Sequence, residues 1–157
     1  MSEEYLDIVD AQNRVVGNAS KADIYAKRLA HRIVHVFVVH PQTGAVYLQR
    51  RAQTRDYLPG YWCTSASGHV MTGETYEQAA QRELAEELGL TTSVQLLRTG
   101  IFEPESFPRH IGLFIAWAAD GIHFADGEVD GGQFWSLDEA AAVITKHDKI
   151  HPQLTST

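Results

Sequence analysis

Glutamates and one arginine crowd a short segment, Gly68–Leu90, whose sequence is GHVMTGETYEQAAQRELAEELGL. Glu83, Glu86 and Glu87 stand at i, i+3 and i+4, so a helix would place their carboxylates on one face. Like charges one turn apart, such as Glu83 and Glu87, cost roughly 0.2–0.5 kcal/mol. A divalent cation bound among the carboxylates would remove that penalty. The segment therefore favours a metal site over an ordinary solvated acidic face.

The segment also contains the signals that begin and end a helix. Thr75 is a favourable N-cap residue, and Gly89 is typical of a helix end. Acids in the last turn oppose the helix dipole by roughly 0.3–1 kcal/mol each, which again favours a bound cation. We expect Glu74 to tie the preceding loop to the helix rather than to take part in chemistry. The predicted buried face recurs every four residues: Tyr76, Ala80, Leu84 and Leu88.

The rest of the chain predicts the elements that must position this helix. Runs rich in β-branched and aromatic residues alternate with turn signals, and two further stretches have helical spacing. Together they predict an α+β fold, with a mixed sheet and a helix on each side. The expected strands are 6–9, 14–17, 32–39, 45–50, 62–70, 92–102, 111–118 and 134–136, and the expected helices are 20–29, 75–88 and 137–147.

Length and composition limit the classes of protein. The 157 residues suit a single domain, 1–157, with a core over 28–150 and an N-terminal hairpin and short helix over 1–27. The net charge of −7 disfavours extended nucleic-acid binding, which needs a basic surface. One cysteine forms no internal disulfide, and neither a signal peptide nor a membrane-spanning run is visible. We therefore expect a cytoplasmic protein without a membrane partner.

The segment Gly68–Leu90 is similar to the Nudix box at every specified position: Gly, five residues, Glu, seven residues, Arg-Glu, an apolar residue, any residue, Glu-Glu, any residue, Gly and an apolar residue. The resemblance implies an α/β/α sandwich around a mixed β-sheet. It also implies a hydrolase that uses Mg²⁺ or Mn²⁺ to cleave diphosphate bonds in nucleoside diphosphates linked to another group. Dimerisation is common among Nudix proteins, so the resemblance leaves a homodimer open.

The same resemblance implies roles for residues of the box. Glu86 and Glu87 would be metal ligands, and Glu83 would be a ligand or the general base. The backbone carbonyl of Gly68 is a further candidate ligand. Arg82 would orient Glu83 or neighbouring acids, and the simpler alternative is an i, i+4 ion pair with Glu86.

Residues outside the box complete the expected site. Nudix enzymes often supply an extra acid from a loop before the last strand, which makes Glu128 a candidate metal ligand. A solvated loop acid is an equal alternative, and Asp126 and Asp130 are close rivals. Arg50 and Arg51 end a predicted strand, and the resemblance implies that an arginine here contacts the diphosphate. Strand alternation would direct the two side chains to opposite faces, so at most one is expected to do so, and Arg55 is a competing candidate.

The upstream sequence is similar to the Nudix branch that contains isopentenyl-diphosphate isomerases. Those enzymes place a reactive cysteine where this chain has Ser67, and Cys63 lies four residues earlier. His31 and His69 match two histidines of the isomerase metal site. The downstream stretch PRHIGLFIAW lacks the glutamate that such a site would need. We therefore expect metal-assisted hydrolysis, with an isomerase-like enzyme and a non-catalytic nucleotide-binding module as the alternatives.

Overall fold

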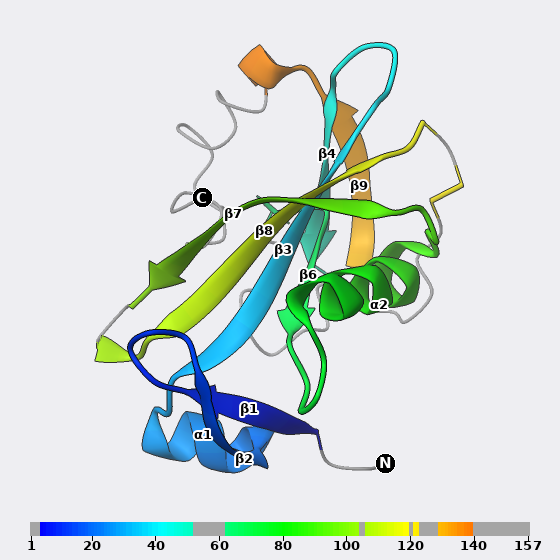
Figure 1. The fold of residues 1–157 in the computed structure, drawn as a ribbon. Coiled ribbons are helices and arrows are strands. Elements are labelled where there is room, and N and C mark those ends of the chain that lie inside the picture. The colour runs from blue at the N-terminus through cyan, green and yellow to red at the C-terminus, as the bar shows by residue number, and fades with distance from the viewer. Residues whose placement is uncertain (1–3, 52–61, 104–105, 120, 123–128, 140–157) are drawn as a thin grey trace.

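A seven-stranded sheet forms the centre of the computed structural model, which describes residues 4–51, 62–103, 106–119, 121–122 and 129–139 (Figure 1). A separate two-stranded sheet lies near the N-terminus. Along the chain the elements are β1 (Tyr5–Val9), β2 (Val15–Ser20), α1 (Lys21–Lys27), β3 (His31–Val39), β4 (Val46–Arg51), β5 (Trp62–Cys63), β6 (Ala66–His69), α2 (Tyr76–Leu88), β7 (Val94–Phe102), β8 (Arg109–Trp117) and β9 (Val129–Trp135).

The large sheet is mixed, as predicted. Its strand order is β5-β4-β3-β8-β7, with β6 paired to β3 and β9 paired to β4. The central strands β3 and β8 run parallel, and the other pairs are antiparallel. This arrangement confirms the α+β fold class. The expected final helix, 137–147, falls mostly outside the described residues, and only 139 and the two residues before it are seen as helical.

Several strand ends differ from the expected bounds by a few residues, and two stretches differ more. The stretch 62–70 is not one strand, because the chain leaves the ladder at Thr64 and Ser65 and divides into β5 and β6, which pair with different partners. The Oγ of Ser65 accepts a hydrogen bond from the Val38 N–H at 2.7 Å, which satisfies that backbone group at the break. Strand β9 begins at Val129 rather than 134, because pairing with β4 extends it across residues that resemble a turn in the sequence.

Helix α2 forms where the sequence predicts it. The Oγ1 of Thr75 accepts a hydrogen bond from the Gln78 N–H at 3.1 Å, and the Gln78 side chain accepts one from the Thr75 N–H at 3.0 Å. This reciprocal capping box fixes the first turn. At the other end Gly89 adopts φ 68°, and its N–H donates to the Ala85 carbonyl at 2.9 Å. Neither described helix is long and apolar enough to cross a membrane.

The core lies between α2 and one face of the sheet (Figure 1). On α2, Ala80, Leu84 and Leu88 are fully buried as predicted, whereas Tyr76 is only half-buried. The ring of Tyr76 lies directly on β8 at Gly112, where an added Cβ would stand 2.6 Å from the ring. Glycine at this position therefore allows the start of α2 to approach the sheet closely.

Residues 4–28, which we call the N-terminal unit, form the β1–β2 hairpin and α1. Ser20, where the expected helix 20–29 begins, caps α1, since its Oγ accepts a hydrogen bond from the Asp23 N–H at 3.2 Å. The unit lies beside the ends of β3 and β8 and the loop before α2 (Figure 1). A second, smaller hydrophobic cluster fills this contact, and its buried members are Leu6, Ile24 and Phe107.

Candidate metal centre

Glu87 is directed from α2 into the sheet and is only 4% exposed. Its Oε1 accepts a hydrogen bond from Gln49 Nε2 of β4 at 3.0 Å, and its Oε2 accepts one from the Ser67 N–H of β6 at 2.9 Å. Gln49 is itself buried. Two donors from two strands thus fix the orientation of this carboxyl group.

Glu83 lies one turn earlier on α2 and packs on the backbone of Gly68. A Cβ added at Gly68 would stand 2.6 Å from Glu83 Oε2 and closer still to its Cδ and Oε1. Glu83 also forms an ion pair with Arg82, whose Nη1 lies 2.7 Å from Oε1. Glycine at position 68 therefore leaves the space that the Glu83 carboxyl group occupies.

The two carboxyl groups of Glu83 and Glu87 interact directly in a buried environment. Burial raises the pKa of Glu83 to about 7, although the Arg82 guanidinium opposes this shift. Burial, together with the charge of Glu83, raises the pKa of Glu87 well above its usual range. Two such acids are costly to ionise together in the absence of a cation. A divalent cation would favour the ionised form of both.

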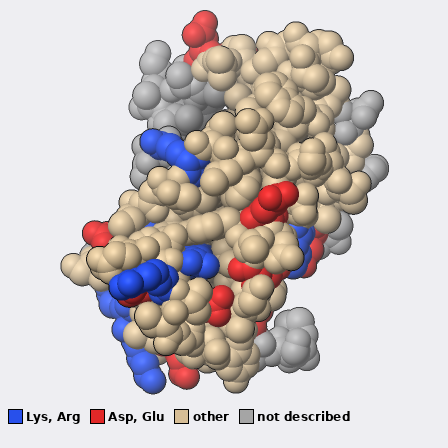
Figure 2. All heavy atoms as spheres, viewed as in Figure 1, with Lys and Arg blue, Asp and Glu red and all other residues tan. Residues whose placement is uncertain are grey.

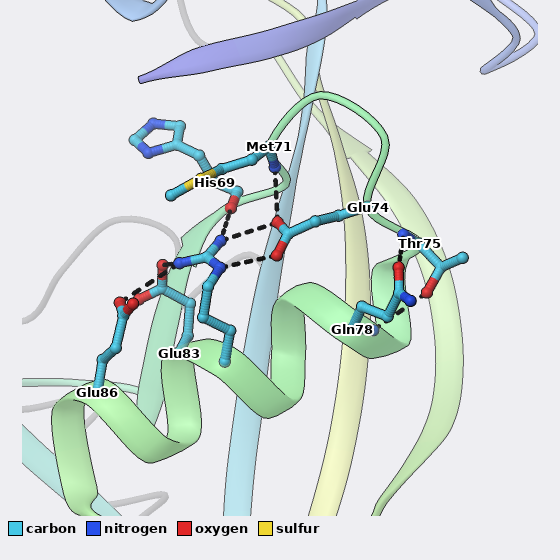
Figure 3. Close-up of polar contacts among 8 residues, drawn as sticks. His69, Met71, Glu74, Thr75, Gln78, Glu83 and Glu86 are labelled. Carbon is cyan, nitrogen blue, oxygen red and sulfur yellow. Dashed lines mark hydrogen bonds and ion pairs between the residues drawn. The ribbon is translucent and has the colours of Figure 1, made fainter. Parts of the chain in front are cut away.

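Arg82 connects Glu83 to the loop before the helix, residues 69–75, which we call the box loop; the acids and loop residues that it contacts are labelled in Figure 3. Its Nε and Nη2 donate to the two oxygens of Glu74 at 2.8 and 3.0 Å, and Nη2 also donates to the His69 carbonyl at 2.8 Å. Glu74 in turn accepts a hydrogen bond from the Met71 N–H at 2.8 Å. The expectation that Glu74 ties the loop to the helix is confirmed.

Glu86, the third acid of the predicted face, is arranged differently. Its side chain is 52% exposed, and its Oε2 lies 3.4 Å from Arg82 Nη1, which is the i, i+4 ion pair considered above. Acidic atoms reach the surface over α2, with basic atoms beside them (Figure 2). Within the described residues no three side chains of His, Cys, Asp or Glu are already gathered as a metal-binding group. A cation bound by Glu83 and Glu87 would recruit Glu86 by rotation of its exposed side chain.

The donor chemistry of these residues fits a hard cation. Carboxylate and carbonyl oxygens are the ligands that Mg²⁺ and Mn²⁺ prefer. The Ser67 N–H points toward Glu87, so the alternation of an antiparallel strand turns the Ser67 carbonyl to that side too. The same alternation turns the Gly68 carbonyl toward Val34 of β3. Ser67 is therefore an alternative backbone ligand to Gly68.

Other expected site residues are described only in part. Arg50 and Arg51 end β4 as predicted, with a register irregularity between them, and their side chains lie outside the described part of the structure. Arg55, Asp126 and Glu128 lie outside the described residues. Asp130 belongs to β9, but its side chain is not described. The roles expected for these six residues stay predictions.

His31 and His69, for which the resemblance implies a place in an isomerase-like metal site, lie side by side, with the guanidinium of Arg109 nearby. The rings of His31 and His69 are stacked with centroids 5.6 Å apart, and the Nε2 of His31 has no hydrogen-bond partner among the described residues. The ring of Phe107 lies 5.5 Å from His31, and the Arg109 guanidinium lies 4.5 Å over Phe107. Burial, and to a smaller extent the charge of Arg109, lowers the pKa of both histidines. A neighbouring guanidinium disfavours a metal cation at these imidazoles.

Two groups that hold Glu87 were not found by sequence reasoning. Gln49 left one signal, since it is a polar residue in the otherwise apolar stretch VYLQ of a predicted strand. The Ser67 N–H left none, because a backbone donor is the same in every residue except proline. Pairing of β4 and β6 with the rest of the sheet brings both groups beneath α2.

Comparisons with known proteins identify the family of this chain. The Nudix domain family model matches residues 29–156. The uncharacterized Nudix hydrolase YfcD of Escherichia coli K12 is 40% identical over 89 residues, which are 57% of this chain and 49% of that protein. Isopentenyl-diphosphate Delta-isomerase 2 of Photorhabdus laumondii is 37% identical over 100 residues, which are 64% of this chain and 56% of that protein. This chain thus spans about half the length of the curated relatives that it matches.

A solved structure matches over almost the whole chain. The crystal structure of DR0079 from Deinococcus radiodurans has a TM-score of 0.83 at 24% identity, and the match covers 98% of this chain and 96% of that one. At this identity the likeness concerns the fold. With a complete box, a matching family model over 29–156 and this fold, the chain belongs to the Nudix family.

Proposed function

We propose that this protein is a divalent-cation-dependent hydrolase that cleaves a diphosphate bond in a nucleotide-derived small molecule. The observation that supports the proposal most strongly is the adjoining pair of carboxyl groups of Glu83 and Glu87, of which Glu87 is buried and Glu83 is 13% exposed. Burying two adjoining acids is costly unless a cation compensates their charge. The pair also lies within a complete Nudix box.

The cation, Mg²⁺ or Mn²⁺, would be held by Glu83, Glu86 and Glu87 with the backbone carbonyl of Ser67, because the Gly68 carbonyl is turned toward Val34 of β3. When bound, such an ion polarises a phosphoryl oxygen and lowers the pKa of a coordinated water. Glu128 remains a further proposed ligand.

The protein's own groups keep the acids in place. Gln49 and the Ser67 N–H donate to Glu87 from the sheet, which favours its ionised form and fixes its orientation. Arg82 fixes Glu83 from the side of the box loop. Glu83 would act either as a further ligand or as the general base that accepts a proton from the attacking water.

The diphosphate would be bound by positive groups outside the acidic cluster. Arg50 and Arg51 end β4, the strand that supplies Gln49 to Glu87. A guanidinium donates two parallel hydrogen bonds to phosphate oxygens, which suits an arginine at this edge of the site. We assign the contact to one of the two residues.

An isomerase acting on a prenyl diphosphate is the second candidate, because an isomerase of Photorhabdus laumondii is among the relatives. Two observations disfavour it. Ser67 stands where the isomerases have their reactive cysteine, and the Arg109 guanidinium lies close to the two histidines that would bind the isomerase metal.

The test is an activity panel on the purified protein. We expect Mg²⁺ or Mn²⁺ to support release of a monophosphate from at least one nucleoside diphosphate derivative. Glu87→Gln should abolish most of this activity without unfolding the protein, because a neutral amide can take the place of a buried acid. A folded, metal-loaded wild-type protein that is inactive on every compound would contradict the proposal.

Two further outcomes would each select an alternative. Proton exchange into isopentenyl diphosphate would indicate the isomerase. Tight binding of a nucleotide without turnover would indicate a binding module.

A further inference from the structure

The N-terminal unit lies outside the residues matched by the family model, yet it contacts the box loop directly. Leu6 of β1 forms an isolated antiparallel bridge with Met71 of the loop. The Met71 side chain also packs against the cluster of Leu6, Ile24 and Phe107. The loop that leads into α2 is therefore bounded on one side by the N-terminal unit rather than by solvent.

Polar contacts also join the N-terminal unit to the box loop and to the start of α2. The Gly73 N–H donates to Asp7 Oδ2 at 3.3 Å, and Asp7 is buried. Asn13 Nδ2 donates to the Tyr76 hydroxyl at 3.0 Å, at the first residue of α2. The N-terminal unit thus contacts both the middle of the box loop and the start of the helix.

The contact nearest the acids is made by Tyr25 of α1. Its hydroxyl lies 2.7 Å from His69 Nε2, and the two rings meet edge to face with centroids 5.7 Å apart. His69 connects this contact with the site, because its backbone carbonyl accepts the hydrogen bond from Arg82. Figure 3 shows the His69 ring directed away from its own carbonyl, which is the group that accepts the hydrogen bond from Arg82. Arg82 then forms the 2.7 Å ion pair with Glu83.

We propose that Tyr25 is a positioning residue for the catalytic acids, acting through His69 and Arg82 on Glu83. The catalytic effect of Tyr25 depends on the proposed function, whereas the contact between Tyr25 and His69 is independent of it. Loss of the Tyr25 hydroxyl removes the side-chain partner that holds His69. The box loop can then shift, and with it the carbonyl that fixes the Arg82 guanidinium.

The test variant is Tyr25→Phe, which deletes one oxygen and keeps the ring beside His31 and Phe107. Tyr5→Phe is the matched control, since it makes the same change in the same unit. The Tyr5 side chain is 51% exposed, and its hydroxyl forms no hydrogen bond with the described residues. Thermal unfolding should show that both variants fold.

Two readouts distinguish positioning from general stability. Amide hydrogen exchange of the peptide 68–76 reports on the box loop without any need for a substrate. Steady-state kinetics on the best diphosphate reports kcat and KM separately. For Tyr25→Phe we expect exchange of this peptide to rise and kcat to fall, each by roughly three- to tenfold, as for loss of one hydrogen bond, with KM unchanged.

A double-mutant cycle makes the test specific. In a His69→Phe background the change Tyr25→Phe should have no further effect on kcat, because the contact is already absent. Additive losses would mean that Tyr25 acts by another route, and they would overturn the inference. Wild-type kcat in Tyr25→Phe, or an equal loss in Tyr5→Phe, would also overturn it.

Failure of the proposed function can be told apart from failure of this inference. If wild-type protein cleaves no diphosphate, the exchange of peptide 68–76 and the affinity for Mn²⁺ decide the role of Tyr25. Faster exchange together with weaker Mn²⁺ binding in Tyr25→Phe alone would support positioning of the acids. Unchanged exchange and unchanged Mn²⁺ affinity would refute it.

Discussion

Gly68→Ala is the most stringent single change at the candidate site, because it adds one methyl group where the Glu83 carboxyl group lies. The new Cβ would stand 2.6 Å from Glu83 Oε2, whereas ordinary contacts begin near 3.4 Å. The carboxyl group must therefore retreat by about 1 Å. The Glu83 carboxyl group is held in a partly buried ion pair with Arg82, so the shift is not absorbed at a freely mobile side-chain end.

The expected consequence is a large loss of activity with a small loss of stability. A misplacement of about 1 Å at reacting groups can lower the rate by ~10²-fold, or about 3 kcal/mol in activation free energy. The assay is kcat on the best diphosphate of the panel, together with the Mn²⁺ concentration that gives half-maximal activity. Thermal unfolding of each variant checks the fold.

Two companion variants make the result interpretable. Gly100→Ala in β7 is the control, since an added Cβ there meets no atom within 4 Å. The change Glu83→Asp withdraws the carboxyl group by one methylene, so adding Gly68→Ala to it should cause little further loss. A Gly68→Ala protein with wild-type kcat and wild-type Mn²⁺ dependence would refute the reasoning.

Two further predictions concern the buried acids. Burial raises the pKa of Glu83 to about 7 from its ordinary 4.5. The contribution of protonated Glu83 to the stability of the metal-free protein is therefore fully present below pH 4.5 and is lost as pH rises through 7. Thermal unfolding in a chelator should give a lower melting temperature at pH 8 than at pH 5, and Glu83→Gln should reduce this difference. A melting temperature that does not depend on pH would contradict the prediction. Gln49→Leu removes the side-chain donor to Glu87 and should weaken Mn²⁺ binding by about tenfold or more, as measured by calorimetry. The control Gln42→Leu, at an exposed position, should leave the affinity unchanged. Equal affinities of the two variants would count against a role for Gln49.

Local signals explain why the helix that bears the acids could be predicted well. Caps and glycine termination act within a few residues, so Thr75 and Gly89 define α2 from the sequence alone. The residues at which strands begin and end were harder to predict. The break at Thr64 and Ser65 and the early start of β9 depend on pairing with strands distant in the sequence, which local patterns do not contain.

In the candidate site, too, some features follow from local sequence and others depend on tertiary packing. The spacing of Glu83, Glu86 and Glu87 predicts a shared face, but only tertiary packing decides which of the three is buried. Glu87 turns into the sheet, whereas Glu86 stays half-exposed beside Arg82. The groups that fix the acids come from far along the chain, as Gln49 does across 38 residues, and strand register alone brings them together.

The N-terminal unit was predicted as a hairpin and short helix without any role in the site. The contacts of this unit with the box loop are long-range, which explains why the sequence did not predict a role for it. Tyr25 and His69 are 44 residues apart, and Tyr25 is the one aromatic residue in a short helix, which is an ordinary pattern. A long-range contact between an extension and a motif loop has no local sequence signal.

Binding of Mn²⁺ tests the central claim most directly, because it needs no knowledge of the substrate. Electron paramagnetic resonance measures free Mn²⁺ during a titration of the protein at pH 8. We predict that wild-type protein removes the free-ion signal and that Glu87→Gln, although folded, removes far less of it. Equal removal by both proteins, or none by the wild type, would contradict a cation site built on the buried acids of α2.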